Sequence, residues 1–553
     1  MKKLATLLLA AGMVLGSFAG AQAIDWKVRG TWAIEFGVFD GLNFSKNSTD
    51  SQRLAKPRKK LQSGAGAGNY DTFEAGQRFD IWLDAVASEN LSGSLRLEIG
   101  GWQWGQHGTS GTRNAGGAMG ERAAAIGVRE AYIDWFVPQT ELKFRMGLHT
   151  ITNPSFTGTS SVIAEQMTGV TASYKFNDNV SLAAFWGRPY NDNYSTAIGN
   201  TPDNSSSRGF ANSFGDNLDV FGLILPLSFD GVKVTPWGAV AAIGPNSITR
   251  DDFSTSYFGG TNRMSIVRAG MLAPYSATNQ RIKNGVLKEY STAWWAGLTG
   301  DITVADPFRF AWDVNYGSVT YPDASYLNRQ GWLLNLLAEY KFDWGVPGLI
   351  FWYGSGDDSN PRNGSEQMPM FEINNPDHAV STFGLNGSPV IGLSSLDGVM
   401  GLDFQAGTWG VGLRIRDVSF LEDLKHTLRV NLFGGTNDPQ MAKYILGKKT
   451  AGTAANRTAL ANFNQRDFNR GSASAGLNNG LYLTRQDYGV EVTFDTSYKI
   501  YENLTMLLEL GYIHLWLDQS RAVWGPGGTT GQGPGGVNVK DALKAMLHFR
   551  YQF

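Results

Sequence analysis

The sequence predicts an all-β protein, a transmembrane antiparallel up-and-down β-barrel of about 18 strands, with about 16 as the alternative. Three observations support this prediction. Segments with a hydrophobic period of two residues recur along the chain, and the connectors between them alternate between short and long. The composition is rich in glycine (68 residues) and tryptophan (17 residues), and only 17% of the residues are charged.

The first alternating segment is DWKVRGTWAIEF, residues 25–36. Trp26, Trp32 and Phe36 fall on its even positions, whereas Lys27 and Glu35 fall on its odd positions. Successive side chains of a strand point to opposite faces of the sheet, so this segment has one apolar face and one charged face. It predicts an amphipathic strand with its tryptophans on one side.

The same alternation predicts the remaining strands. Their period is two residues rather than 3.6, which favours strands over helices. The segments lie near 78–87, 94–99, 128–137, 141–148, 168–176, 180–187, 218–227, 232–242, 291–304, 308–316, 331–341, 349–355, 401–416, 425–434, 488–494, 504–517 and 543–553.

The connectors are sorted by length. Short polar turns such as 88–90 and 177–179 alternate with long loops rich in Gly, Asn, Ser and Asp, such as 37–76 and 187–217. Outer-membrane barrels have short periplasmic turns on one side and long extracellular loops on the other. A soluble β-sandwich has no reason to sort its loops in this way, so the pattern favours a membrane barrel.

In a membrane barrel, the apolar faces of the strands contact lipid. In hydrocarbon the backbone has no water to bond with, so the sheet must close and present its apolar side chains to lipid. Aromatic rings gather at the two membrane interfaces of such proteins. The residues expected there, at or near strand ends, are Trp26, Trp32, Trp102, Trp135, Trp409 and Tyr551.

The amino-terminal segment predicts export. Lys2 and Lys3 precede an apolar run over 4–18, and Ala21-Gln22-Ala23 forms a small-residue cleavage site. Residues 1–23 are therefore expected to be a signal peptide, and residues 24–553 a single transmembrane β-barrel domain in the outer membrane of a Gram-negative cell. The chain has no cysteine, which excludes disulfides and thiolate metal sites. A net charge of −2 argues against nucleic-acid binding.

The predicted inward faces carry many ionisable residues of both signs. A dry core could not hold so many charges, so we expect a water-filled channel. The segment Thr150–Met167 is unusually apolar for a surface loop and is expected to fold into the bore, where Glu165 would face arginines of the wall. The alternative is that the charges pair locally along the wall. The candidates for the pore lining and constriction are Arg78, Asp80, Arg96, Glu98, Arg145, Glu165, Arg309, Asp313 and Arg429.

Motifs for other chemistry are missing from the sequence. The six histidines include no HExxH pair, and the segment around Gly447 and Lys448 lacks the remainder of a phosphate-binding loop. There is no G-x-S-x-G nucleophile motif. Residues 354–360 (GSGDDSN) could bind calcium, but the acids lack the EF-hand spacing and a polar loop is favoured. We therefore expect no enzyme activity, no cofactor and no metal site.

Several stretches resemble a known family. The ending LKAMLHFRYQF, with Phe549, Tyr551 and Phe553, resembles the assembly signal of outer-membrane barrels. The first 38 residues, together with the stretches VREAYIDW, GLIFWYGSGDD and SYKIYENLTMLLELGY, resemble the homotrimeric outer-membrane porins of sulfate-reducing bacteria. The resemblance implies a homotrimer that passes ions and small hydrophilic solutes by passive diffusion. Its partners would be outer-membrane lipid including lipopolysaccharide and the barrel assembly machinery.

Two other functions stay open. A solute-selective porin, for sugars or carboxylates, would need an inward aromatic track or a ladder of one charge sign, and the sequence shows mixed signs with Trp82 as one of few inward aromatics. A surface adhesin or structural barrel would use the long loops and would have a blocked bore. Conductance separates these functions.

Overall fold

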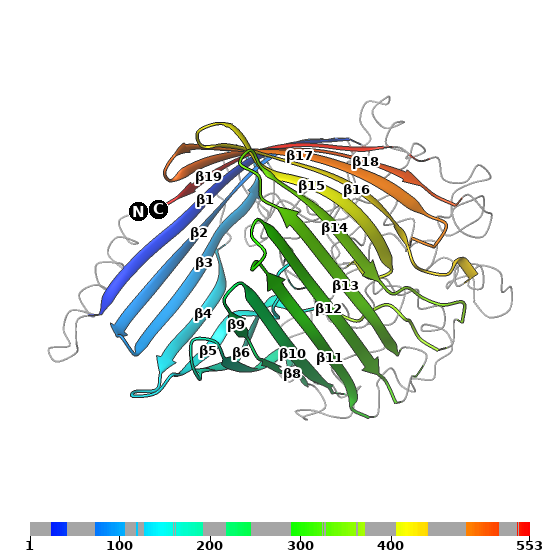
Figure 1. Cartoon of the computed structure of the whole chain (residues 1–553). Helices are drawn as coiled ribbons and strands as arrows, with labels where there is room; N and C mark the ends of the chain where they lie inside the picture. Colours follow the sequence, from blue (N-terminus) through cyan, green and yellow to red (C-terminus); the bar gives the residue numbers. More distant parts are fainter. Residues whose placement is uncertain are drawn as a thin grey trace.

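The computed structural model describes residues 24–40, 72–105, 118–119, 126–158, 160, 162–191, 217–244, 289–322, 325, 328–360, 363–370, 405–440, 483–518, 539 and 541–553. The expected signal peptide and most of each long loop, including the basic run at 56–60, lie outside these residues. The described residues form one sheet of strands joined in chain order (Figure 1).

The sheet has nineteen segments. Each alternates between an apolar face and a face of polar or small residues, as the period of two predicts. In chain order they are β1 (Asp25–Asp40), β2 (Thr72–Ser88), β3 (Leu91–Gln103), β4 (Ile126–Phe136), β5 (Leu142–Thr152), β6 (Ala164–Lys175), β7 (Ser181–Asn191), β8 (Asn217–Ile224), β9 (Leu227–Phe229), β10 (Val232–Ile243), β11 (Ser291–Ile302), β12 (Phe308–Thr320), β13 (Arg329–Tyr340), β14 (Val346–Gly354), β15 (Thr408–Leu421), β16 (Leu424–Gly435), β17 (Tyr488–Tyr501), β18 (Leu504–Trp516) and β19 (Ala542–Gln552).

β8 and β9 are two parts of one strand. Both pair with β10, and they are separated only by Leu225 and Pro226. Proline has no backbone N–H to donate to a ladder, so it interrupts the strand that the sequence predicts over 218–227. The wall therefore has eighteen strands, which confirms the predicted number.

The sheet closes on itself. β1 pairs antiparallel with both β2 and β19, so the described wall has no free edge. Turns of two to five residues join β2 to β3, β4 to β5, β6 to β7, β9 to β10, β11 to β12, β13 to β14, β15 to β16 and β17 to β18. β1 begins and β19 ends on this short-turn side, as the antiparallel pairing of Thr31 with Gln552 shows.

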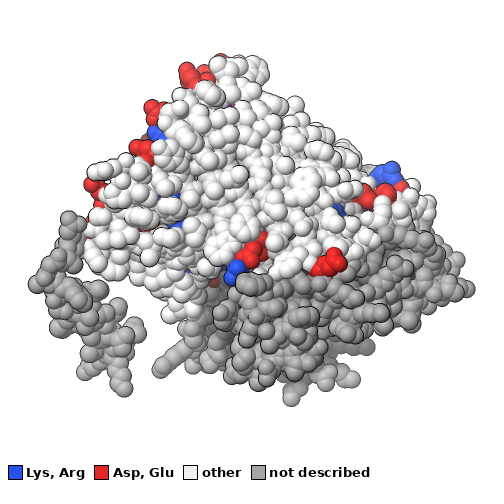
Figure 2. Space-filling view, turned by 90° about the horizontal axis from the view of Figure 1, so that it is seen from below, with Lys and Arg blue, Asp and Glu red and all other residues white. Residues whose placement is uncertain are grey.

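The outer face is apolar. Large side chains on the predicted outward positions are solvent-exposed in the isolated chain, with Trp26 49% exposed and Leu349 60% exposed. Figure 2 shows a broad surface on which charged atoms are sparse and lie mainly toward its margins. An exposed apolar area of this size is stable only against lipid or another apolar surface. Trp26, Trp135 and Tyr551 are exposed on this face near strand ends, as predicted for interfacial aromatics. Trp32 is exposed but lies in the middle of β1, and Trp409 is half-buried. Nothing is described of the side chain of Trp102.

The last residue joins the two ends of the wall. The Gly30 N–H donates to the Phe553 carbonyl (2.9 Å), and the Phe553 N–H donates to the Gly30 carbonyl (3.1 Å). The Phe553 ring covers Gly30 so closely that a Cβ at position 30 would lie 2.5 Å from the ring. The terminal aromatic ring therefore packs directly on Gly30. Its role as an assembly signal stays a prediction.

Substitution of Gly30 by valine is expected to destabilise the barrel by about 1–3 kcal/mol, because the added carbons overlap the Phe553 ring. Urea unfolding of the protein refolded into liposomes measures the effect. The control is Gly93→Val, at an outward position of β3 where a Cβ would meet its nearest atom at 3.8 Å. Equal stability of the two variants would mean that the ring moves aside freely.

Candidate functional site: the lumen and its constriction loop

The segment between β5 and β6 leaves the wall and enters the barrel. β4 pairs with β5 only as far as Leu148, and β6 pairs with β7 only as far as Thr168. β5 and β6 continue to pair with each other up to Thr152 and Ala164. Among the described strands, none is paired with this end of the hairpin on either side, so it can bend inward, as the sequence predicts for Thr150–Met167. We call 150–167 the constriction loop.

The tip of the constriction loop is hydrogen-bonded to β12. Asp313 accepts from the Ser155 hydroxyl (2.7 Å), from the backbone N–H groups of Phe156 (3.2 Å) and Thr157 (3.3 Å), and from the Thr157 hydroxyl. Arg309 donates to the Phe156 carbonyl (3.0 Å). Asp313 is only 3% exposed. One buried carboxylate thus holds three consecutive residues of the loop.

The other side of the constriction loop is packed against the wall. Val162 and Ile163 are fully buried in an apolar cluster inside the barrel. The cluster contains inward-facing side chains of β7, β8, β10 and β11, including Phe185, Val220, Trp237 and Trp295. Burial of this apolar face holds the loop to one sector of the wall, and that sector is filled rather than open.

A second segment lies inside the same sector. In the stretch that follows β14, Met368 and Met370 are fully buried in the apolar cluster. The Trp295 indole N–H donates to the Pro369 carbonyl (2.7 Å), and Arg329 donates to the Met368 carbonyl (3.3 Å). Two infolded segments therefore narrow the lumen from the side of β7 to β13.

Upstream in this second segment, acidic and amide groups form a small cluster. The Asn363 amide donates to both Asp358 (3.0 Å) and Glu366 (2.9 Å). Burial raises the pKa of the Glu366 carboxyl. A carboxyl with a raised folded-state pKa contributes stability at low pH that is lost as the pH rises through that pKa. The described residues nevertheless contain no group of three side chains that could hold a metal ion.

The opposite wall carries a network of three arginines and three acids. Arg78 and Arg96 both contact Asp80, at 2.7 Å and 3.1 Å. Arg129 contacts Glu98 at 2.5 Å and donates to the Gln166 side chain of the constriction loop. The network on β2, β3 and β4 consists of Arg78, Asp80, Arg96, Glu98, Arg129 and Glu130.

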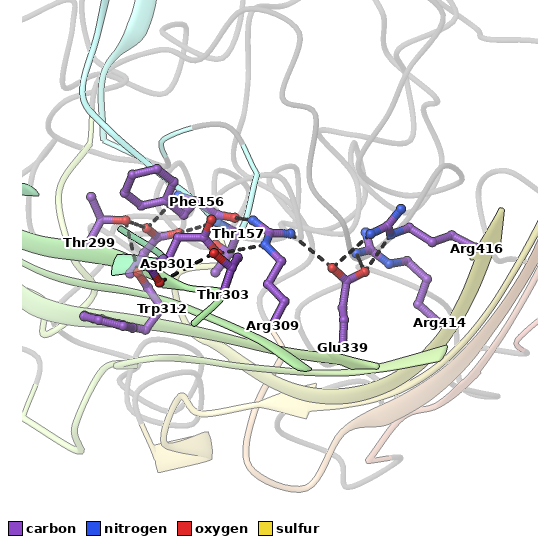
Figure 3. A network of polar contacts seen from close by, with 12 residues as sticks. Phe156, Thr157, Thr299, Asp301, Thr303, Arg309, Trp312, Glu339, Arg414 and Arg416 are labelled. Carbon is purple, nitrogen blue, oxygen red and sulfur yellow. Dashed lines mark hydrogen bonds and ion pairs between the residues drawn. The ribbon is translucent and has the colours of Figure 1, made fainter. Parts of the chain in front are cut away.

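A second network lies on β11, β12, β13 and β15, beside the residues of β12 that bond to the constriction loop (Figure 3). Glu339 accepts from Arg309 (3.1 Å), Arg414 (2.7 Å) and Arg416 (2.7 Å). Arg309 also contacts Asp301 at 2.7 Å. Arg309 therefore bonds to both this network and the constriction loop.

Two further groups of charges lie on the inner face. Glu35 and Glu509 lie on either side of His548, and Lys544 contacts Glu509 at 2.7 Å. Arg429 forms an ion pair with Asp495. In every group, cations and acids alternate, so that charge is compensated within a few ångströms.

Two inward aromatic rings carry guanidinium groups. Arg29 and Arg96 lie 5.0 Å and 4.7 Å from the Trp82 ring, and Arg145 lies 4.1 Å from the Tyr132 ring. These distances are those of cation–π contacts. The rings thus position charged side chains of the wall rather than forming a bare aromatic track.

The predicted site residues all lie on inward positions of the wall or in the constriction loop. The structure brings Arg78, Asp80, Arg96 and Glu98 together in one network. Arg309 and Asp313 both lie on the inner face of β12, and both bond to the constriction loop. Arg145 pairs with Asp134 (2.7 Å) instead of meeting the loop. The tip of the loop bonds to β12, and the expected facing of Glu165 with arginines of the wall stays a prediction.

Sequence reasoning missed two groups of residues. Arg129 turns inward because β4 has a bulge opposite Arg96 and Leu97, and the bulge changes the alternation locally. The buried inward aromatics Trp237, Trp295 and Trp352 were also missed. The adjacent Trp294 and Trp295 show why: one is 42% exposed on the outer face and the other 1% exposed inside, and the composition of the pair does not indicate which is which.

The closed eighteen-stranded wall, with its apolar outer face and charged inner face, defines a transmembrane β-barrel. Within the described ranges no helix is long and apolar enough to cross a membrane.

No family model and no curated protein matches the chain. Among solved structures, the chain is similar to OprD of Pseudomonas aeruginosa (11% identity, 97% of each chain covered, TM-score 0.45). It is also similar to OccK11 (OpdR) of the same organism (10%, 96% of each chain, 0.43) and to OccAB3 of Acinetobacter baumannii (9%, 95% of this chain and 99% of that chain, 0.45). At such identities and TM-scores the likeness has no weight for function.

Proposed function

We propose that the protein is a porin of the Gram-negative outer membrane that passes ions and small hydrophilic solutes by passive diffusion. A wall of 16 to 18 strands is wide enough to leave an aqueous channel. The observation that carries the proposal is that inward charged side chains are reached by solvent. The side chains of Arg29, Arg145, Arg309 and Arg416 are 58%, 34%, 31% and 35% exposed, although they lie on the inner face.

The charge pattern supports weak ion selectivity. Arginines and acids alternate in both networks, so neither sign is left unopposed along the described lining. A channel selective for carboxylates would favour a run of uncompensated cations at its narrowest part. The ion-pair pattern therefore favours a channel that accepts either sign of ion and neutral solutes.

We also propose a homotrimer that is inserted by the barrel assembly machinery and surrounded by lipid that includes lipopolysaccharide. The resemblance of the sequence to homotrimeric porins supports this assembly. The apolar outer face can pack against lipid and against a second copy with the same chemistry.

Single-channel recording of the purified protein in a planar bilayer tests the proposal. We expect ohmic steps that arrive in threes, with a reversal potential near zero in a gradient of KCl because the lining charges are compensated. A folded, heat-modifiable protein without conductance would contradict the porin and would favour the adhesin or structural barrel. A strong preference for one ion sign would contradict the reading of the charge networks.

A further inference from the structure

A cavity of about 510 Å³ lies on the constriction loop. None of the described residues that line it is ionisable. Thr152 and Gly158 are solvent-exposed at its margin, so solvent reaches the cavity. The cavity has the volume of a small-molecule site. Its polar lining consists of Thr150, Thr152, Asn153, Ser155, Ser160 and Gln166.

Two hydroxyl groups of the lining already donate their protons to carboxylates. The Thr150 hydroxyl donates to Glu130 (2.8 Å), and the Ser155 hydroxyl donates to Asp313 (2.7 Å). A hydroxyl that has given its proton to a carboxylate can bind a further partner only as an acceptor. These two oxygens therefore suit a solute that donates hydrogen bonds.

Asn153 places an unpartnered amide in the lining of the cavity. It lines the cavity, is only 1% exposed, and both its side-chain nitrogen and its side-chain oxygen are buried without a hydrogen-bond partner. A buried polar group without a partner lowers stability by about 1–3 kcal/mol. A primary amide offers an NH2 group that donates and a carbonyl oxygen that accepts, side by side. An anion would satisfy only the nitrogen and a cation only the oxygen, whereas a hydroxyl group can satisfy either.

We propose that the cavity on the constriction loop binds a neutral polyhydroxylated solute of monosaccharide size. The inference deepens the proposed function and rests on it, since the site would lie on the diffusion path. Paired hydroxyl groups of the solute donate to Thr150 and Ser155 and bond to both halves of the Asn153 amide. The charged networks of the wall are already paired internally, so they do not compete for such a solute.

The first test measures the ion current through the full-length protein in a planar bilayer while glucose is added. Binding in the constriction should reduce the current along a saturating curve. Gluconate, which has a similar shape but carries a charge, should show no saturation at the same concentrations. A purely linear decrease with glucose would reflect viscosity alone, would mean that ordered water fills the cavity, and would overturn the proposal.

The second test uses Asn153→Leu, which replaces the amide by an apolar side chain of similar size. The half-saturating glucose concentration should rise at least about tenfold, corresponding to about 1.4 kcal/mol. The control is Asn217→Leu, which removes a buried asparagine outside the cavity lining whose side-chain oxygen also lacks a partner. An unchanged half-saturation in Asn153→Leu would overturn the assignment of the site.

Calorimetric titration of the detergent-folded protein with glucose separates failure of the site from failure of the channel. Glucose binding that Asn153→Leu abolishes, in a protein without ion current, would support the site and contradict the porin. Normal ion current without glucose binding in either experiment would leave the porin intact and overturn the site.

Discussion

Substitution of Asp313 by alanine should increase the single-channel conductance and its noise. Asp313 is the only carboxylate among the described residues that hydrogen-bonds to Ser155, Phe156 and Thr157 at the tip of the constriction loop. Hydrogen bonds to a charged group contribute about 1.5–3 kcal/mol each. Loss of even one or two shifts the balance between the docked and undocked tip by tenfold or more, since each 1.4 kcal/mol is a factor of about ten.

The loop should not leave the lumen altogether in this variant. Val162 and Ile163 remain buried against the wall and are untouched by the substitution. The expected result is therefore a larger and fluctuating conductance in a barrel that folds normally, because the backbone ladder of β12 is intact. Planar-bilayer recording measures the effect, and Ser155→Ala should change the conductance in the same direction by a smaller amount.

Asp495→Ala is the matched control for Asp313→Ala. Asp495 is also an inward carboxylate of the wall, but it pairs with Arg429 on the neighbouring strand. Its removal changes the charge of the lumen by the same amount without releasing the loop. If both variants raise the conductance equally, lumen charge rather than the loop sets the current. If neither does, the tip of the loop does not narrow the path.

Much of the wall can be predicted from sequence because two solvents act on it. Lipid outside and polar surroundings inside impose an alternation that repeats in every strand, as in β19, where Leu543 is exposed and Lys544 is buried. The alternation fixes the faces, and the sorting of connectors fixes the order of the strands. It fails where the backbone departs from regular pairing, as at Pro226 and at the bulge that turns Arg129 inward.

The contacts inside the barrel are harder to predict from the sequence. The apolar composition around Val162 and Ile163 predicts that the constriction loop seeks a buried position. The sequence does not indicate where, because Ser155 and Asp313 are 158 residues apart and no periodic rule relates them. The same holds for Glu339 on β13 and its three arginines, of which Arg309 lies on β12 and the other two lie on β15. Asp80 and Glu339 are buried and are contacted by arginines, which is the local pairing along the wall that the sequence left open as the alternative.

The assignment of faces makes the second strong prediction. Ile34 lies on the outward face in the middle of β1, opposite Phe549 of β19 and Gln77 of β2. Arginine at an outward position near the middle of the bilayer destabilises a barrel by about 2–4 kcal/mol, because the guanidinium is transferred into hydrocarbon. Ile34→Arg should therefore unfold at a markedly lower urea concentration than the unmodified protein when both are refolded into liposomes.

Thr31→Arg introduces the same side chain three residues away on the inward face. Thr31 is paired with Asp80 on β2 and with Gln552 on β19, so the new guanidinium would lie near a carboxylate and near the lumen rather than in lipid. We expect its unfolding midpoint to stay close to that of the unmodified protein. Because both variants gain an arginine on the same strand, a difference between their unfolding midpoints reflects the environment of the two faces. Equal destabilisation at the two positions would mean that the outer surface of β1 does not meet lipid, and it would contradict the membrane-spanning assignment of the barrel itself.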